Sequence, residues 1–412
     1  MTRLLGFMIE GVAVGGEYVF RIVLPNGVVE EARQDLASLK AEYGVDYTIH
    51  APPNGELDDA DFAGLAAFAN KSVPVQGWIV LFPYFRNALL LDAPIATIFP
   101  DGIPVVFPVP DQGAWGPNGY HVRWRDQVQA LLSGSDRVVT FSEHVAGEQA
   151  GALFGVERDR IRVVPHAPPN LAHLLPFVRN GVKTDETRAI AADMLRAHAR
   201  ERGWISLQDY PFEEVDYIAV STQDRVTKNI RLIADAISTL IRKDRMDLKL
   251  FMTAPLHWGA TWTPLPALLQ AEQLMGDVVS MTDLPRDVHA AFYHCAALTV
   301  HPSIFEGGLG PFPFYEAVSV GTPCLIADGP HVREFAGQQP LLAPYIFDPN
   351  DVTMLRNLVV STFADRDGAL SDQAAVLKNL SDYGWKDVAS AYARAAIEPS
   401  TRATPRNTSE AR

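Results

Sequence analysis

The chain has 412 residues, of which 48% are hydrophobic and 20% are charged, and its formal net charge is −14 at pH 7. This ordinary globular composition excludes a largely disordered, collagen-like or low-complexity chain, and the length predicts two large domains. The acidic balance argues against a nucleic-acid partner. The two cysteines, Cys295 and Cys324, are too few for a disulfide scaffold or an iron–sulfur cluster, and we interpret both as reduced core residues.

The first 165 residues alternate apolar runs with amphipathic segments, which predicts a doubly wound α/β domain with a mainly parallel sheet. We place this first Rossmann-like domain at residues 1–166. The expected strands are Leu4–Ile9, Tyr47–His50, Trp78–Phe82, Val105–Val109, Arg137–Phe141 and Ile161–Val164. The expected helices are Val29–Tyr43, Asp59–Ala69, Val122–Leu132 and Glu143–Phe154, and Glu17–Leu24 is predicted as either a strand or a helix.

A second α/β series begins after residues 167–212, which we interpret as a linker with an inserted helix over Thr184–Arg202. The strands expected beyond it are Val215–Val220, Leu248–Thr253, Val278–Met281, Ala297–Val300 and Pro323–Ala327. The expected helices are Ile230–Ile241, Val288–His294, Glu316–Val320, Leu355–Ala364 and Asp372–Leu380. The pattern predicts a second Rossmann-like domain over 213–382, a closing helix over 383–398, and a disordered tail over 399–412.

A Gly/Pro-rich loop between two glutamates follows the expected strand Ala297–Val300. The loop and its flanks read His301-Pro-Ser-Ile-Phe-Glu-Gly-Gly-Leu-Gly-Pro-Phe-Pro-Phe-Tyr-Glu-Ala-Val-Ser-Val-Gly-Thr-Pro. Glycines let backbone N–H groups approach a sugar or phosphate closely, and the N-terminus of the following helix favours anions. The carboxylates of Glu306 and Glu316 can accept hydrogen bonds from sugar hydroxyls. The alternative is a Gly-rich connector with two surface glutamates.

This segment resembles the C-terminal signature of retaining GT-B glycosyltransferases of family 4. The resemblance implies two Rossmann-like domains facing a cleft, with a nucleotide-diphosphate sugar bound by the second domain and the acceptor bound by the first. It implies that Glu316 binds the nucleotide ribose and that Glu306 acts on the donor sugar. It also assigns to donor binding the loop residues Gly307, Gly308, Leu309 and Gly310.

The chain has nine residues between the two glutamates (307 to 315), whereas the family has seven. We predict that Gly310–Phe314 absorbs the extra length as a bulge, because Pro311 and Pro313 can hold an extended turn. Phe312 or Phe314 would then project towards the cleft, with Phe312 the candidate for lining the sugar or acceptor pocket. The alternative is that both rings pack into the core.

A basic pair follows the expected strand Val215–Val220, in the segment Gln223-Asp-Arg-Val-Thr-Lys-Asn. It resembles the family's Arg-Pro-x-Lys-Asn segment. Arg225 and Lys228 would then flank the diphosphate and stabilise it as it leaves. The alternative is a solvated basic pair that caps a helix.

Three weaker signals come from the first domain. Asp111 stands where the family often has His-Asp, with Pro110 in place of the histidine, and is a candidate for polarising the acceptor hydroxyl; the alternative is a turn or helix cap. Gly15 and Gly16 resemble the glycine pair of the family's first loop, near the donor phosphates, or mark an ordinary turn. His166 is a candidate cleft residue or a structural histidine.

The resemblance as a whole implies a cytoplasmic, metal-independent and cofactor-free transferase that moves a sugar to an acceptor hydroxyl with retention of configuration. The expected setting is bacterial polysaccharide or glycoconjugate synthesis. The expected acceptor is a carbohydrate, a glycolipid or a small molecule, and a peripheral membrane contact is compatible with it. Three rival hypotheses are a catalytically silent GT-B module that binds or regulates a partner, a glycosidase using Glu306 and Glu316 as a carboxylate pair, and a sugar-nucleotide epimerase.

Overall fold

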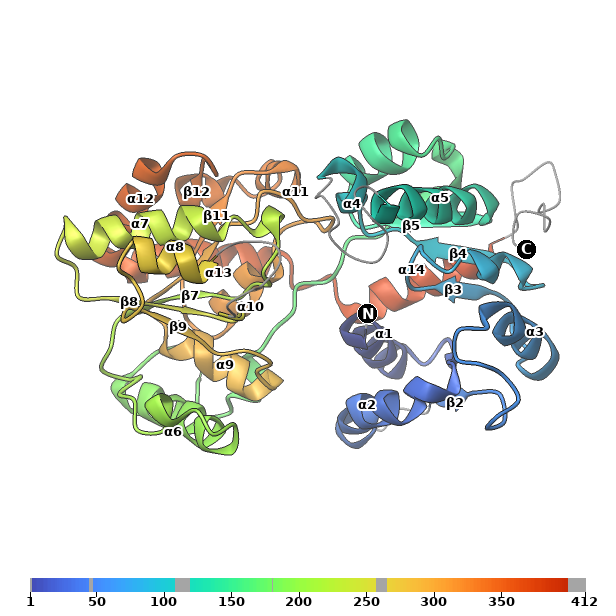
Figure 1. Cartoon of the computed structure of the whole chain (residues 1–412), viewed down its shortest axis with the longest axis horizontal. Helices are drawn as coiled ribbons and strands as arrows, with labels where there is room; N and C mark the ends of the chain where they lie inside the picture. The colour runs from blue at the N-terminus through green and yellow to red at the C-terminus, as the bar shows by residue number, and fades with distance from the viewer. Residues whose placement is uncertain (1, 44–46, 108–118, 180, 257–264, 399–412) are drawn as a thin grey trace. The chain divides into compact units, whose positions relative to one another are not determined.

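The computed structural model describes residues 2–43, 47–107, 119–179, 181–256 and 265–398 (Figure 1). The chain divides into two compact units. One unit comprises Met1–Ala167 and Tyr383–Arg412, and the other comprises Pro168–Asp382. No helix among the described residues is long and apolar enough to cross a membrane.

The first unit contains a four-stranded parallel sheet in the order β3-β4-β5-β6 and a separate parallel pair, β1-β2. Its strands are β1 (Arg21–Val23), β2 (Thr48–His50), β3 (Trp78–Val80), β4 (Ile95–Ile98), β5 (Arg137–Thr140) and β6 (Ile161–Val163). Its helices are α1 (Thr2–Gly15), α2 (Val29–Tyr43), α3 (Phe62–Ser72), α4 (Ile103–Val106), α5 (Gly119–Gly134), a π-helix at Val145–Leu153, and α14 (Trp385–Ile397). Short 3-10 helices lie at Asn26–Val28, Arg86–Leu90 and Arg158–Arg160.

Two expectations for the first unit are wrong. The segment Leu4–Ile9 lies inside helix α1 instead of forming a strand, and the stacking of Phe7 on Trp385 of α14, with centroids 4.2 Å apart, shows what stabilises the helix. Val105 and Val106 of the expected strand Val105–Val109 lie in the short helix α4, and residues 108–109 lie outside the described residues. The buried strand that precedes them, β4, was not expected.

The second unit is built on a six-stranded parallel sheet in the order β12-β11-β10-β7-β8-β9. Its strands are β7 (Tyr217–Val220), β8 (Lys249–Met252), β9 (Val278–Ser280), β10 (Leu298–His301), β11 (Cys324–Ala327) and β12 (Ile346–Phe347). Its helices are α6 (Asp185–Glu201), α7 (Ile230–Arg242), α8 (Leu265–Ala271), α9 (Arg286–Cys295), α10 (Phe312–Ser319), α11 (Pro330–Ala336), α12 (Val352–Ala364) and α13 (Arg366–Asn379). Its 3-10 helices are Ala172–Leu174, Ile205–Leu207, Val226–Lys228 and Pro340–Tyr345.

Strand β7 is buried on both faces because helices cover both sides of the sheet (Figure 1). Ile218 and Val220 belong to the core cluster that contains residues of α7 and α12, whereas Tyr217 and Ala219 belong to the cluster that contains residues of α6 and α9. This alternation is the two-residue period of a strand. Because both faces of β7 are buried, its sequence is a continuous apolar run and does not alternate between apolar and polar residues.

Residues 168–212 of the expected linker 167–212 belong to the second unit and pack into it. Leu195 of α6 is fully buried in the core cluster shared with α9. Lys183, just before α6, donates to the carbonyl of Ala296 at 2.5 Å and to Thr322 Oγ1 at 2.8 Å. Burial lowers the pKa of Lys183 to about 7. Thr322 lies in the Gly-Thr-Pro segment, so this motif is used to hold the α6 region in place.

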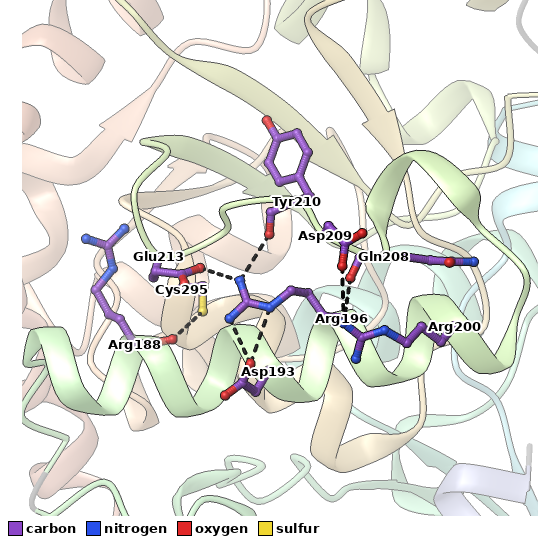
Figure 2. A network of polar contacts seen from close by, with 9 residues as sticks. All are labelled: Arg188, Asp193, Arg196, Arg200, Gln208, Asp209, Tyr210, Glu213 and Cys295. Carbon is purple, nitrogen blue, oxygen red and sulfur yellow. Dashed lines mark hydrogen bonds and ion pairs between the residues drawn. The ribbon is translucent and has the colours of Figure 1, made fainter.

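A polar network also fixes the exposed side of α6 (Figure 2). Arg196 donates to Glu213 Oε2 at 2.7 Å, to Asp193 Oδ1 at 2.8 Å and to the carbonyl of Tyr210 at 3.1 Å. The hydrogen bond from Arg196 lowers the pKa of Glu213. Cys295 lies nearby as a free, buried thiol, and burial raises its pKa to about 12, which agrees with the interpretation of this cysteine as a core residue.

Candidate functional site

The order of strands in the second sheet singles out one place for a ligand. From β7 the chain proceeds to β8 and β9 on one side, whereas β10, β11 and β12 lie on the other side of β7. Ligands of open α/β sheets bind outside the carboxyl ends of the strands where the order reverses. The loop that leaves β7 at this point, residues 221–229, contains the basic pair. The loop that leaves β10, residues 302–311, contains Glu306 and the glycines that follow it.

The two loops are held together by the buried residue Thr227. Its carbonyl accepts a hydrogen bond from the backbone N–H of Ile304 at 2.9 Å and another from Ser303 Oγ at 3.2 Å. Asn229 follows in a left-handed conformation with φ 49°, which asparagine tolerates better than most residues, and its side-chain amide donates to the carbonyl of Pro349 at 2.8 Å. These contacts fix the backbone on both sides of Lys228.

An ion pair joins the two loops. The Lys228 ammonium donates to Glu306 Oε1, and His301 Nε2 lies 3.7 Å from the same oxygen. The side chains are 16%, 26% and 5% exposed for Lys228, Glu306 and His301, respectively. Burial opposes ionisation of Glu306, but Lys228, His301 and His331 together outweigh it and lower the pKa of Glu306 to about 2. Burial lowers the pKa of His301 to about 3, so the imidazole is neutral at pH 7 while Glu306 is ionised.

Arg225 lies three residues before Lys228 and is exposed. Its guanidinium makes no hydrogen bond or ion pair with any residue that the structure describes. A solvated guanidinium beside a fixed ammonium is an arrangement that can bind a phosphate group. Arg225 is the N-cap residue of the short 3-10 helix Val226–Lys228, and its side chain forms no cap hydrogen bond.

The glycine loop after Glu306 contains one glycine that the fold requires and one that it does not. Gly310 has φ 74°, and a Cβ added there would overlap the hydroxyl of Tyr315 and lie 3.0 Å from the ring of Phe335. Its N–H donates to the carbonyl of His331 at 3.2 Å. A Cβ added at Gly308 would meet only the carbonyl of Gly310 at 3.7 Å, an ordinary contact. The loop packs further through Tyr315, whose hydroxyl donates to the carbonyl of Leu309 at 3.0 Å.

Glu316 lies in the second turn of α10 and is 1% exposed. The Tyr293 hydroxyl of α9 donates to its Oε2 at 3.4 Å. The ring of His289, one turn earlier in α9, lies 4.7 Å from the ring of Tyr293, and His289 Nε2 lies 2.9 Å from Ser221 Oγ. These four side chains link α10 and α9 to the first residue after β7. The sequence analysis missed Ser221, His289 and Tyr293, although the i, i+4 spacing of His289 and Tyr293 places both on one helix face.

The expected bulge at Gly310–Phe314 is wrong. Pro311 is the N-cap of α10 and Pro313 lies in its first turn, where proline is tolerated, so residues 312–314 are helical and do not form a bulge. Phe314 is fully buried in a core cluster with Phe335, and it does not project from the fold. Phe312 is half-buried and packs against the same cluster.

The residues predicted in the first domain lie in different surroundings. Gly15 ends helix α1, and Gly16 follows with φ 67° and donates to the carbonyl of Val12 at 2.8 Å, as a helix C-terminus requires. The glycine pair therefore lies at the C-terminus of a helix. The ring of His166 packs against Phe141 at 3.8 Å and near Trp385 at 5.4 Å, within the first unit. Asp111 lies outside the described residues.

Comparison with known proteins identifies the type of domain that bears the site. Residues 215–365 match the model of the family described as glycosyl transferases group 1. The matched segment contains the loops after β7 and β10, and with them Lys228 and Glu306. A search of curated proteins found no match.

Solved structures match most of the chain. A glycosyltransferase from Rickettsia africae is 13% identical, with a TM-score of 0.61 over 94% of this chain and 91% of that one. HepE from Anabaena, solved with UDP-glucose, is 11% identical, with a TM-score of 0.59 over 91% and 98% of the two chains. Sucrose-phosphate synthase from Thermosynechococcus elongatus is 17% identical, with a TM-score of 0.51 over 89% and 77%.

These likenesses show the fold: the chain has the GT-B fold, with two Rossmann-like units. The resemblance to group 1 glycosyltransferases is confirmed, and the family match supports the glycosyltransferase class.

Proposed function

We propose that the protein transfers a sugar from a nucleotide-diphosphate donor to an acceptor hydroxyl with retention of configuration. One observation carries the proposal. At the reversal point of the second sheet, the Lys228–Glu306 pair, the exposed Arg225 and the Gly308 backbone belong to two loops tied together through Thr227. This set offers two cations for a diphosphate and one ionised carboxylate for sugar hydroxyls.

The reaction breaks the bond between the anomeric carbon and the diphosphate oxygen. It forms a bond from that carbon to the acceptor oxygen, and the acceptor proton goes to the leaving phosphate. Negative charge therefore grows on the diphosphate, where Arg225 and Lys228 stabilise it. Glu306 stays ionised at neutral pH because its pKa lies near 2, so it accepts hydrogen bonds and does not donate a proton. This charge state suits a residue that positions the sugar.

Glu316 is the proposed ribose ligand. Its carboxylate is buried and its Oε2 receives the Tyr293 hydroxyl, which fixes its orientation on α10. The proposal places the nucleotide beside α9 and α10. It includes a reaction without a metal or other cofactor, in the cytoplasm, in bacterial polysaccharide or glycoconjugate synthesis. The HepE complex with UDP and glucose supports a uridine nucleotide as the first donor to test.

The test combines binding and turnover. UDP and other nucleoside diphosphates are titrated by calorimetry, and UDP-sugars are then offered with acceptor mixtures in the presence of EDTA. The anomeric configuration of the product is read by NMR. Retention with full activity in EDTA is the expected result, whereas inversion or an absolute metal requirement contradicts the corresponding part of the proposal.

The rival hypotheses give different outcomes in the same assays. A silent GT-B module binds the nucleotide sugar without turnover, and an epimerase changes the donor sugar without an acceptor. A glycosidase hydrolyses glycosides without a nucleotide. The glycosidase is the least supported, because Glu306 is paired with Lys228 and Glu316 is 1% exposed, so neither carboxylate is placed as a free acid–nucleophile pair.

A further inference from the structure

The first unit has a partly open apolar cavity of about 1240 Å³ that the proposed donor site does not use. Its wall includes β1 and β3, two strands that belong to different sheets, together with residues of α1, α2, α3 and α14. Small-molecule pockets in proteins usually have about 300–1,000 Å³. The cavity is therefore large enough for a ligand with a long hydrocarbon part.

The inner wall of the cavity is hydrocarbon. Met8, Leu36 and Ala69 come from three helices and are each at most 2% exposed. The rings of Phe62 and Phe85, with centroids 5.1 Å apart, add an aromatic side to the wall. Binding of an apolar ligand removes this surface from water, which is favourable. A polar ligand would find few hydrogen-bond partners on it.

The charged residues that line the cavity are exposed and mostly acidic. They are Glu17, Glu31, Asp35 and Asp59, with Arg21 as the single cation among the lining residues. Four carboxylates against one guanidinium repel an anionic head group such as a phosphate or a carboxylate. Hydroxyl groups, in contrast, can donate to carboxylates.

We propose that this cavity binds the hydrocarbon part of an uncharged amphiphile whose hydroxyl-bearing head group is the sugar acceptor. The acceptor role rests on the proposed function, whereas the binding of the hydrocarbon does not. In the transfer, the head-group oxygen gains the bond to the anomeric carbon and its proton leaves with the diphosphate. An extended peptide paired to β1 or β3 fits less well, because each strand is only three residues long and offers few backbone hydrogen bonds.

The first experiment uses octyl, decyl and dodecyl maltoside as probes, each below its critical micelle concentration, with binding to the full chain measured by calorimetry. Burying two more methylenes should tighten binding by up to about tenfold at each step. Dodecyl phosphate should bind more weakly than dodecyl maltoside. Affinity that is independent of chain length, or tighter binding of the phosphate, would overturn the proposal.

The second experiment fills the cavity. Ala32 of α2 lines it, whereas Ala37 of the same helix is exposed and lies outside it, so Ala32→Phe and Ala37→Phe form a matched pair. Ala32→Phe should weaken dodecyl maltoside binding by at least about tenfold, and Ala37→Phe should leave it unchanged. Circular dichroism checks that both variants are folded. Equal affinity in the two folded variants would overturn the proposal, as would displacement of the maltoside by unrelated extended peptides.

Nucleotide binding separates this inference from the proposed function. The donor loops belong to the second unit, so Ala32→Phe should bind UDP as the unaltered chain does. Chain-length-dependent maltoside binding by a protein that binds no nucleotide would support the cavity assignment and contradict the transferase proposal. Nucleotide-dependent transfer to short water-soluble sugars, without any maltoside binding, would support the transferase and overturn the cavity assignment.

Discussion

Replacing Lys228 by methionine should remove the charge that keeps Glu306 ionised while preserving the aliphatic part of the side chain. The pKa of Glu306 lies near 2 in the folded protein and is 4.5 in the absence of its neighbours. A difference of this size corresponds to about 3 kcal/mol of stability at pH 7. Both partners are less than a third exposed, so solvent screens the pair only in part. We therefore expect Lys228→Met to lower the free energy of unfolding by about 2–3 kcal/mol at pH 7.

The pH dependence of this loss follows from the sign of the shift. A carboxyl group with a depressed pKa stabilises the fold above its unfolded pKa, and the stabilisation is lost as the pH falls through the folded pKa. The difference between the unaltered chain and Lys228→Met should thus be largest above about pH 4.5 and should shrink towards pH 2. Urea unfolding at several pH values, compared by midpoints at equal slopes, measures it.

Two further variants make the test specific. Lys378→Met removes an exposed lysine of the same unit and should cost less than about 1 kcal/mol. The double variant Lys228→Met/Glu306→Gln should lose less than the sum of the two single variants, because the unpaired carboxylate is gone. A loss below about 0.5 kcal/mol for Lys228→Met that does not change between pH 3 and 7 would refute the reasoning and make the pair an ordinary surface contact.

Three other predictions concern the site and its surroundings. Arg225→Ala should lower kcat by about 10²-fold with little change in the urea midpoint, and normal turnover would contradict its role at the diphosphate. Glu316→Gln should weaken nucleotide binding by about tenfold or more in calorimetry, since hydrogen bonds to charged groups contribute about 1.5–3 kcal/mol; unchanged affinity would remove Glu316 from the ribose site. Phe314→Ala should cost about 3–5 kcal/mol of stability as a core truncation, and Phe312→Ala clearly less; equal losses in thermal or urea unfolding would show that both rings serve the core.

The sequence predicts most of the fold, and its errors have physical causes. The helix expected at Val29–Tyr43 has these limits in the structure. The run Leu4–Ile9 is too short and too uniformly apolar for its period to distinguish strand from helix, and the contact that decides, Phe7 on Trp385, is with the far end of the chain. Strand β4 was missed because it is only four residues long, and its burial on both faces removes the alternating pattern.

The site was predictable as a set of residues but not as a set of contacts. The motifs point to Glu306 and Lys228 separately, with the carboxylate assigned to the sugar and the ammonium to the diphosphate. That they form an ion pair depends on β7 and β10 being neighbours in the sheet, and no local pattern encodes that order. Tyr293 illustrates the same limit, because its contact with Glu316 joins two helices that are separated in the chain by strand β10 and the glycine loop.

Gly308 and Gly310, two of the three glycines in the loop after Glu306, show how the demands of fold and function separate within one loop. Gly310 is explained without any ligand, because its positive φ and the neighbouring Tyr315 hydroxyl leave no room for a side chain. Gly308 has no such explanation, since an added Cβ would make only one ordinary contact at 3.7 Å. Where the fold itself does not require a glycine, the close approach of a ligand to the backbone can explain why the residue has no side chain. We therefore expect the donor to approach the backbone of Gly308 beside the Lys228–Glu306 pair.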